Sequence, residues 1–277
     1  MDIIHVENLS KKYEHFNLDN LNLTIPTGSV VGLVGANGAG KTTLIKLLLG
    51  MIKKDAGNID IIPKEEIGIV LDDAFLPELL KINDINIIMK NIYKNWDEKK
   101  FQEYLKKFNL INNVTIKSLS KGMKKKLEIA TSLSHHPRLL ILDEPTSGLD
   151  PIVRGEVLDL FREFMESDDH SILISSHITS DLENIADSIV LMNNGKIILN
   201  ESMIKIMDNY GIIHCTKEIF EELKDNALNY RQNKYDYEVL IANKKELKKK
   251  YKELNIDKAN IDEMMYLLVR GEKEWKD

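Results

Sequence analysis

The sequence has very little of several features that would place it in other protein classes. Its 277 residues include one cysteine, Cys215, so no intramolecular disulfide can form and a reducing compartment is indicated. No apolar run approaches the length that is needed to cross a bilayer. Polar residues at the start, Asp2 and His5, exclude a secretory signal peptide. We therefore expect a cytoplasmic protein, for which another chain would supply any membrane-spanning helices.

The chain also lacks a basic excess and a biased composition. Its formal net charge is −6, which gives no reason to expect nucleic-acid binding. The hydrophobic fraction of 43% and the charged fraction of 30% are ordinary for a soluble globular protein. The length suits one large domain, alone or with a small appendage.

A glycine-rich octapeptide, GANGAGKT, occupies residues 35–42 with the spacing of a phosphate-binding loop. The apolar run 29–34 predicts a buried strand before it, and residues 43–49 predict a helix that ends at Gly50. Strand, turn and helix together would place backbone N–H groups and a positive helix terminus around a polyphosphate. The sequence therefore predicts a nucleoside triphosphate site, where Lys41 reaches the β- and γ-phosphates and the Thr42 hydroxyl holds Mg²⁺.

A second apolar run, residues 139–142, ends in two acids, Asp143 and Glu144. In open α/β sheets, ligands bind at the carboxyl ends of such strands. Asp143 is placed to support Mg²⁺, usually through water, and Glu144 is placed to polarise the attacking water. Alone, the same pattern is equally typical of a strand that meets solvent, so its interpretation depends on the rest of the chain.

Further motifs accompany these two in a definite order. They are Tyr13, the segment LSKGM at 119–123, the segment SGLD at 147–150, and His177 after a strand-like run at 171–176. In order and spacing, the whole set resembles the ATPase subunit of ATP-binding-cassette (ABC) transporters over roughly residues 2–200.

The resemblance implies a fold and a domain organisation. The fold is an α/β P-loop NTPase core with an N-terminal antiparallel β portion, a helical subdomain insert and a small C-terminal α+β appendage. The ATPase domain would span residues 1–205, with the helical subdomain at about 74–118, and the accessory domain would span 206–277.

The resemblance also implies residue roles. Tyr13 would stack on adenine, and His177 would contact the γ-phosphate as a switch. Ser120 and Gly122 would reach the γ-phosphate of a partner's ATP across a dimer, and Asp150 would couple the two sites. The phosphate loop itself would comprise Gly35, Asn37, Gly38, Ala39, Gly40, Lys41, Thr42 and Thr43. Taken alone, Tyr13 could be a half-buried aromatic, His177 a strand-end histidine and Ser120 a helix N-cap.

Two departures from the family pattern stand out. Lys121 and Met123 replace the third and fifth residues of the usual Leu-Ser-Gly-Gly-Gln signature. Asp72 stands where the family has a glutamine after the strand at 67–71. A carboxylate there can still ligate Mg²⁺ or a water, so Asp72 joins Thr42 and Asp143 as a metal residue. We expect activity to be retained, at an equal or lower rate.

The insert between these motifs has helical patterns. Ile85, Ile88, Met89 and Ile92 share one face of a first helix, and these residues are expected to be mostly core. Asp97 is expected to cap a second helix, whose apolar face carries Phe101, Leu105 and Phe108. The stretch Phe75–Pro77 is expected to be an exposed contact for the membrane subunit.

Beyond about Asn200, the appendage is expected to pack separately. Residues 237–241 predict a strand, and Lys244–Leu254 predicts a lysine-rich amphipathic helix. For its lysines we prefer a solvated face over a contact with lipid headgroups.

The motifs fit three possible functions unequally. An exporter ATPase, with ATP and Mg²⁺ as cofactors, would work peripherally on the inner face of the membrane with a separate transmembrane permease. It would pair as a homodimer or with a paralogous ATPase. The stretch 91–97, Asp72 and the appendage are similar to ATPases of Gram-positive peptide and antibiotic exporters, of the bacitracin and phenol-soluble-modulin type. A ribosome- or DNA-acting ATPase fits less well, because there is one cassette and a short interval from Lys41 to Leu119. A non-hydrolysing module is disfavoured, because Glu144 and His177 are both present.

Overall fold

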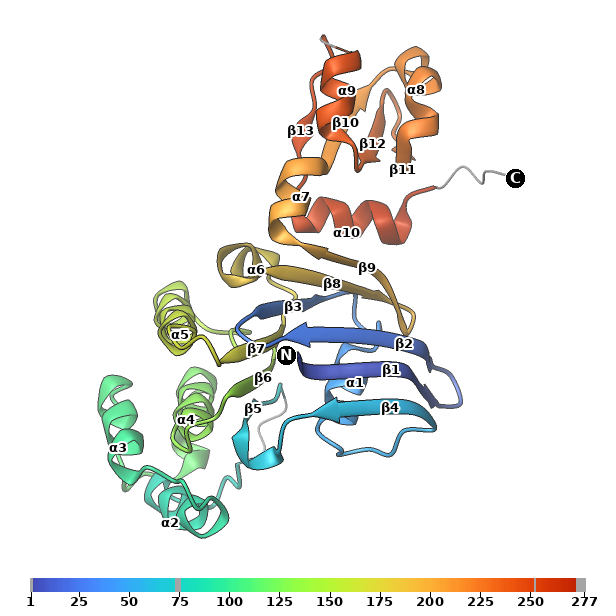
Figure 1. Ribbon diagram of the computed structural model, residues 1–277. Helices are drawn as coiled ribbons and strands as arrows, with labels where there is room; N and C mark the ends of the chain where they lie inside the picture. Colours follow the sequence, from blue (N-terminus) through green and yellow to red (C-terminus); the bar gives the residue numbers. More distant parts are fainter. Residues whose placement is uncertain (1, 73–75, 252, 273–277) are drawn as a thin grey trace.

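The computed structural model describes residues 2–72, 76–251 and 253–272 (Figure 1). Its centre is a six-stranded sheet in the order β5-β6-β7-β3-β8-β9, in which only the pair β8–β9 is antiparallel. The strands are β3 (Val30–Val34), β5 (Ile67–Val70), β6 (Leu139–Asp143), β7 (Ser171–Ser175), β8 (Ser188–Asn193) and β9 (Lys196–Ser202). Every residue of β3, β6 and β7 is buried, as expected for parallel strands covered on both faces.

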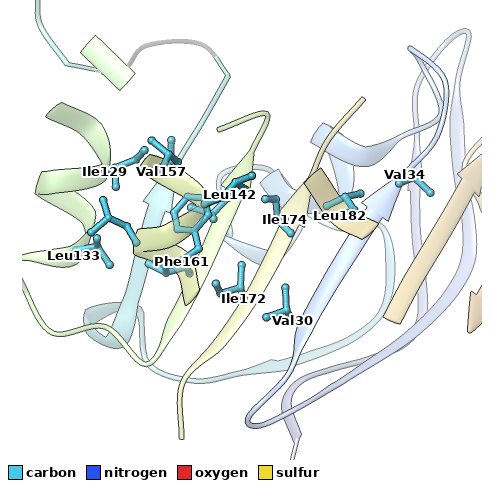
Figure 2. Packing of buried hydrophobic residues seen from close by; sticks show 14 of the residues in the cluster. Val30, Val34, Ile129, Leu133, Leu142, Val157, Phe161, Ile172, Ile174 and Leu182 are labelled. Atoms are coloured by element: carbon cyan, nitrogen blue, oxygen red, sulfur yellow. The ribbon is translucent and has the colours of Figure 1, made fainter. Parts of the chain in front are cut away.

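Helices on one face of this sheet complete the main core. They are α4 (Lys121–Leu133), α5 (Pro151–Phe164) and α6 (Thr179–Ile185). Figure 2 shows Leu133 and Phe161 of two of these helices near Leu142 and Ile172 of the sheet, and all four belong to one buried cluster. Alternate strand residues point the other way, so that Leu173 joins the second cluster around α1 (Lys41–Leu48).

The N-terminal part forms a separate antiparallel sheet in the order β2-β1-β4. Its strands are β1 (Asp2–Lys12), β2 (Asn17–Pro26) and β4 (Ala56–Ile61). The pair β1–β2 confirms the expected antiparallel portion, whereas β4 is a third strand that the sequence patterns did not suggest. The sheet packs over α1 through a shared apolar cluster, and this places the turn between β1 and β2 beside the phosphate loop.

The helical insert consists of α2 (Ile82–Ile92) and α3 (Glu98–Lys107) ahead of α4. The Asp97 carboxylate accepts the Lys100 N–H at 2.9 Å, so the predicted cap of α3 is confirmed. The predicted apolar face of α3 is also confirmed, since its residues are at most 4% exposed, namely Phe101, Leu105 and Phe108.

The predicted apolar face of α2 is only partly buried. Ile85 is buried, but Ile88 and Ile92 are 37% and 61% exposed, because α2 lies at the outer edge of the molecule (Figure 1). The expected exposed stretch at Phe75–Pro77 is wrong at Leu76, which is 5% exposed and packs in the main cluster. Phe75 lies outside the described residues.

The C-terminal part follows α7 (Met203–Asn209). Its elements are β10 (Gly211–Cys215), α8 (Lys217–Leu223), β11 (Ala227–Gln232), β12 (Tyr237–Ile241), α9 (Lys244–Lys250), β13 (Asp257–Lys258) and α10 (Ile261–Arg270). The strands form one antiparallel sheet in the order β11-β12-β10-β13. This succession before α10 is the βαββαβ pattern of ferredoxin-like folds. The predicted strand at 237–241 is confirmed, while the predicted lysine-rich helix ends at Lys250, four residues early.

Helix α10 joins this part to the six-stranded sheet and lies between the C-terminal sheet and strand β9 (Figure 1). Met264 and Leu267 on α10 share one buried cluster with Ile189 and Leu191 of β8. The opposite face of the C-terminal sheet has its own cluster, which includes Ile213. The expectation of a separately packed appendage therefore holds for that outer face only, and the division at residue 206 stays a prediction.

Candidate nucleotide-binding site

The phosphate loop, residues 35–40, connects β3 to α1 and depends on its glycines. Gly35 and Gly40 have φ angles of 152° and 109°, which L side chains rarely adopt. A Cβ at Gly35 would lie 2.4 Å from the Met192 carbonyl oxygen, and one at Gly40 would lie 2.8 Å from the Phe16 ring. The loop can therefore keep this tight path only with glycine at both positions.

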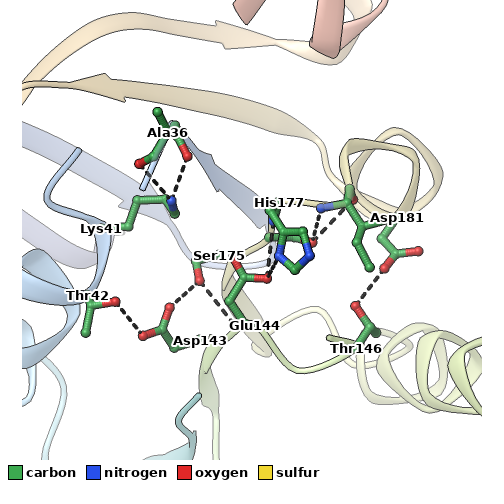
Figure 3. Close-up of polar contacts among 12 residues, drawn as sticks. Ala36, Lys41, Thr42, Asp143, Glu144, Thr146, Ser175, His177 and Asp181 are labelled. Carbon is green, nitrogen blue, oxygen red and sulfur yellow. Dashed lines mark hydrogen bonds and ion pairs between the residues drawn. The ribbon is translucent and has the colours of Figure 1, made fainter. Parts of the chain in front are cut away.

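Lys41 begins α1 and lines the pocket together with the acids Asp143 and Glu144. Its ammonium donates to the carbonyl oxygens of Gly35 at 2.7 Å and Ala36 at 3.4 Å (Figure 3). Burial lowers the pKa of Lys41 from its ordinary value, while the charges of Glu144 and Asp143 oppose that shift. The cation is thus held where the loop could present it to phosphate oxygens.

A chain of oxygen atoms links α1 to the ends of two central strands. The Thr42 hydroxyl donates to one Asp143 carboxylate oxygen at 2.9 Å, and the Ser175 hydroxyl donates to the other (Figure 3). Asp143 is 2% exposed, so both of its oxygens depend on these partners. Hydroxyl and carboxylate oxygens are ligands that suit Mg²⁺, and the Asp72 carboxylate lines the same pocket. The residues present therefore fit a magnesium ion.

Glu144 and His177 form the second half of the site. His177 approaches one Glu144 carboxylate oxygen with its ring Nδ1 at 2.5 Å and with its backbone N–H at 3.2 Å. The Glu144 backbone has a φ of 52°, and its N–H donates to the Ser175 carbonyl at 3.1 Å. This turn in the backbone directs the carboxylate along the strand ends toward His177. A carboxylate held in this way can accept a proton from a water molecule.

The pocket in front of these groups has a volume of about 520 Å³. It is lined by His15, Phe16, residues 37–43, Asp72, Asp143, Glu144 and Asn194. A neighbouring hollow of about 560 Å³ shares His15, Phe16 and Asn194. Tyr13 lines neither, and it is 46% exposed with its ring centroid 6.4 Å from that of Phe16. Phe16 was missed in the sequence, although an aromatic residue three positions after Tyr13 in the same turn was an available signal.

A polar link behind Glu144 was also missed. Asp181 on α6 is 1% exposed and accepts the Thr146 hydroxyl at 2.7 Å (Figure 3). It also pairs with Arg154 of α5 at 2.5 Å. The turn after Glu144 is thereby tied to the helix that follows His177. Thr146 and Asp181 each lie among other polar residues, so the sequence gives no signal that these two would meet.

The remaining predicted residues lie away from the pocket within one chain. Ser120 caps α4 by accepting the Met123 N–H at 3.3 Å. Asp150 caps α5 by accepting the N–H groups of Ile152 and Val153 at 3.1 Å each. Gly122 is close to Leu149, next to Asp150. These residues form a second group, in which Ser120 and Asp150 are exposed and Gly122 is half-buried, and a role for them at a nucleotide would require another copy of the cassette.

Throughout the described ranges, none of the helices has the length and apolar character that spanning a bilayer requires.

Comparison with known proteins agrees with this geometry. The ABC transporter family profile matches residues 18–147. The lantibiotic transport ATP-binding protein SrtF of Streptococcus pyogenes is 38% identical over 209 residues, covering 72% of this chain and 90% of SrtF. The bacitracin transport ATP-binding protein BcrA of Bacillus licheniformis is 34% identical, over 71% of this chain and 68% of BcrA. The resemblance to ATPases of the bacitracin type is therefore confirmed.

Solved structures give the same result for the fold. The structure of an ATP-binding subunit of an ABC transporter is similar with a TM-score of 0.68 and 27% identity, over 74% of this chain and 91% of that one. A dimeric post-hydrolysis cassette bound to ADP and Pi has a TM-score of 0.65 at 22% identity, over 72% of this chain and 98% of that one. The chain therefore belongs to the family of ABC transporter ATP-binding proteins, which are P-loop ATPases.

Proposed function

We propose that the chain is the ATP-hydrolysing subunit of a membrane ABC exporter, which dimerises on ATP and drives a separate transmembrane subunit. Relatives whose names assign them to lantibiotic and bacitracin transport support peptides or antibiotics as the exported class. The protein would associate peripherally with the inner face of the cell membrane, because the permease would hold it there.

The proposal of ATP hydrolysis rests mainly on one observation: two acidic residues, Asp143 and Glu144, line the same pocket as the phosphate loop. Asp143 bonds to the Thr42 hydroxyl, and Glu144 lies in the same pocket beside His177. Phosphoryl transfer needs one group for the metal and another for the attacking water, so this division of labour fits hydrolysis. In this proposal Lys41 and the loop N–H groups bind the β- and γ-phosphates. Phe16 and Tyr13, in the turn between β1 and β2, would face the adenine base.

Bound Mg²⁺ would neutralise charge on the phosphates, and Thr42, Asp72 and Asp143 would hold it. Glu144 would take the proton of the attacking water at its carboxylate. His177, within 2.5 Å of that carboxylate, would orient it and then contact the γ-phosphate. Both groups sit at strand ends that the buried sheet keeps rigid, so the carboxylate and the ring need little reorganisation.

The exposed group around Ser120, Gly122 and Asp150 supports a role across a dimer. Ser120 lies at the N-terminus of α4, where N–H groups and the helix dipole favour an anion. The partner's γ-phosphate is the anion that we assign to it.

An apolar face on the helical insert is the surface that we assign to the permease. Ile92 is 61% exposed, and a hollow of about 310 Å³ opens beside α2. That hollow is lined by Met51, Ile69, Leu71, Met89, Tyr93, Thr131, Ser132 and His135. An amphipathic segment of a membrane subunit could bury its apolar side there.

The experiment that tests the catalytic assignment is Glu144→Gln, which keeps the shape of the side chain but removes the base. We expect ATP affinity to be retained while turnover falls on the order of 10²–10⁴-fold. Glu163→Gln, a change at an exposed surface carboxylate paired with Lys107, is the matched control and should leave turnover unchanged. Normal turnover of Glu144→Gln would remove Glu144 from the role of base.

A further inference from the structure

Helix α4 contains an ion pair that is almost completely buried. The side chains of Lys125 and Glu128 are 4% and 1% exposed, and their charged atoms lie 3.2 Å apart. Taking two charges out of water costs more than their mutual attraction usually returns, so such a pair is poor evidence for stability. We therefore ask what the pair contacts and whether it serves the nearby site.

Lys125 makes its shortest contact outside its own helix. Its ammonium donates to the Leu71 carbonyl oxygen at 2.7 Å. Strand β5 ends at Val70, so this bond holds the chain where it leaves the sheet, one residue before Asp72. Asp72 lines the phosphate pocket together with Thr42 and Asp143. The position of Asp72 thus depends on a backbone segment that a buried cation anchors.

Glu128 is suited to keep the cation in place. Its Oε2 has no hydrogen-bond partner among the described residues, so the approach of Lys125 is what compensates its charge. Burial raises the pKa of the Glu128 carboxyl, and the charge of Asp72 adds to the rise while Lys125 opposes it. The charge of Asp72 therefore acts on the Glu128 carboxyl.

The same helix reaches the exposed group that we assign to the partner's nucleotide. Helix α4 begins at its cap, Ser120, five residues before Lys125, which is about 7.5 Å along the axis. Lys125 therefore links the first turns of α4, which follow Ser120, to the backbone that carries Asp72.

We propose that Lys125 is a positioning residue that sets the Asp72 carboxylate at the metal site, with Glu128 as its buried anchor. This inference rests on the proposed function, in which Asp72 holds Mg²⁺. Neither Lys125 nor Glu128 lines the phosphate pocket, so in this proposal both act through the Leu71 carbonyl.

The test uses the full-length double variant Lys125→Met/Glu128→Leu, which removes both charges and leaves no uncompensated one behind. We expect the protein to stay folded, to bind ATP without metal as before, and to need roughly 10-fold more Mg²⁺ for half-maximal hydrolysis. Lys125→Arg, which keeps the charge and the donor, should remain close to wild type. Lys126→Met is the matched control, because Lys126 pairs with Glu156 at 2.9 Å near the surface and makes no bond to Leu71.

Combination with Asp72→Ala separates the possible failures. In that background the double variant should raise the half-saturating Mg²⁺ concentration no further, because the group that Lys125 positions is gone. If Asp72→Ala changes the Mg²⁺ dependence and the double variant does not, the role of Lys125 is overturned and the proposed function stands. If Asp72→Ala itself leaves the Mg²⁺ dependence unchanged, the metal role of Asp72 and this inference fall together.

A folding defect would not leave the proposal untested. Should Lys125→Met/Glu128→Leu not fold, Lys125→Met/Glu128→Gln keeps a polar side chain at position 128, carries no charge at either position and has no donor for the Leu71 carbonyl. A raised half-saturating Mg²⁺ concentration in that variant supports the proposal, and an unchanged one overturns it.

Discussion

Asp72 stands where the resemblance implies a glutamine, and its carboxylate lines the pocket of Thr42 and Asp143. If it performs the glutamine's work on metal and water, Asp72→Ala should lower hydrolysis and weaken its Mg²⁺ dependence. Asp72→Gln should be tolerated, since an amide oxygen can also ligate the metal. ATPase rates measured across a Mg²⁺ titration check both expectations.

The neighbouring acid provides the control for that prediction. Asp73→Ala should change little, although Asp73 itself lies outside the described residues. A larger effect at Asp73 than at Asp72 would mean that the metal residue is one position further along the chain.

His135 makes stability depend on pH at the level of a single residue. Its ring is 2% exposed, and Nε2 donates to the Ile67 carbonyl at 3.1 Å. Burial lowers the pKa of His135 from the ordinary 6.5, so the unfolded chain binds more protons in acid. Its contribution to the free energy of unfolding should be complete above about pH 6.5 and lost as the pH falls toward the folded-state pKa, by at most about 1.4 kcal/mol per pH unit.

Urea unfolding at about pH 8 and about pH 5.5 would measure this term. The variant His135→Gln keeps a donor for Ile67 and does not titrate, so it should lose less stability in acid than the wild type. His15→Gln is the control, because the His15 side chain is 90% exposed. An equal loss in the wild type and His135→Gln would exclude His135 as the source.

At the scale of elements, α10 is the contact through which the C-terminal part is held. Leu267 is 0% exposed in the cluster that also contains Ile189 and Leu191 of β8. We expect Leu267→Ala to lower the free energy of unfolding by about 2–5 kcal/mol, as for other large buried side chains. ATP affinity should be unchanged at temperatures where the protein stays folded, because the pocket residues lie in other elements.

Asp262→Ala, at an exposed position of the same helix, is the control for chemical unfolding curves, and it should cost much less. An equal cost for both variants would mean that α10 is not held through Leu267. The shared cluster also predicts the outcome of a truncation near Asn209. Such a chain would expose Ile189 and Leu191, and the loss of solubility would precede any effect on nucleotide binding.

At the scale of the whole molecule, one copy of the chain leaves Ser120, Gly122 and Asp150 outside the pocket. We therefore expect the isolated protein to be monomeric without nucleotide. The Glu144→Gln form should dimerise with ATP, because hydrolysis no longer separates the copies. Light scattering coupled to gel filtration measures the mass in both states.

Ser120→Arg in the Glu144→Gln background is the control, since a bulky cation at this helix terminus should block the dimer without touching the chain's own phosphate loop. If Glu144→Gln shows no change in mass with ATP, the second copy is not the partner, and a heterodimer with a paralogous ATPase becomes the alternative.

The sequence by itself determined the parts of this protein that depend on neighbouring residues. The loop at 35–42 needs glycine where φ is positive, and the short apolar runs at 139–142 and 172–174 predict buried strands of a wound sheet. The Asp97 cap and the apolar face of α3 follow from helical spacing alone. These features are local, so their physical causes are visible within a few positions.

Only the tertiary structure decided the features that join distant segments. Strand β4 pairs with β1 across about fifty residues, and Ser175 reaches Asp143 from another strand. Phe16 enters the pocket because the N-terminal sheet packs beside the phosphate loop. Lys125 and Glu128 are charged, yet both are buried, and Lys125 bonds to the Leu71 carbonyl just after β5. Which polar groups meet is set by the packing of sheets and helices, and a pattern along one element carries no record of it.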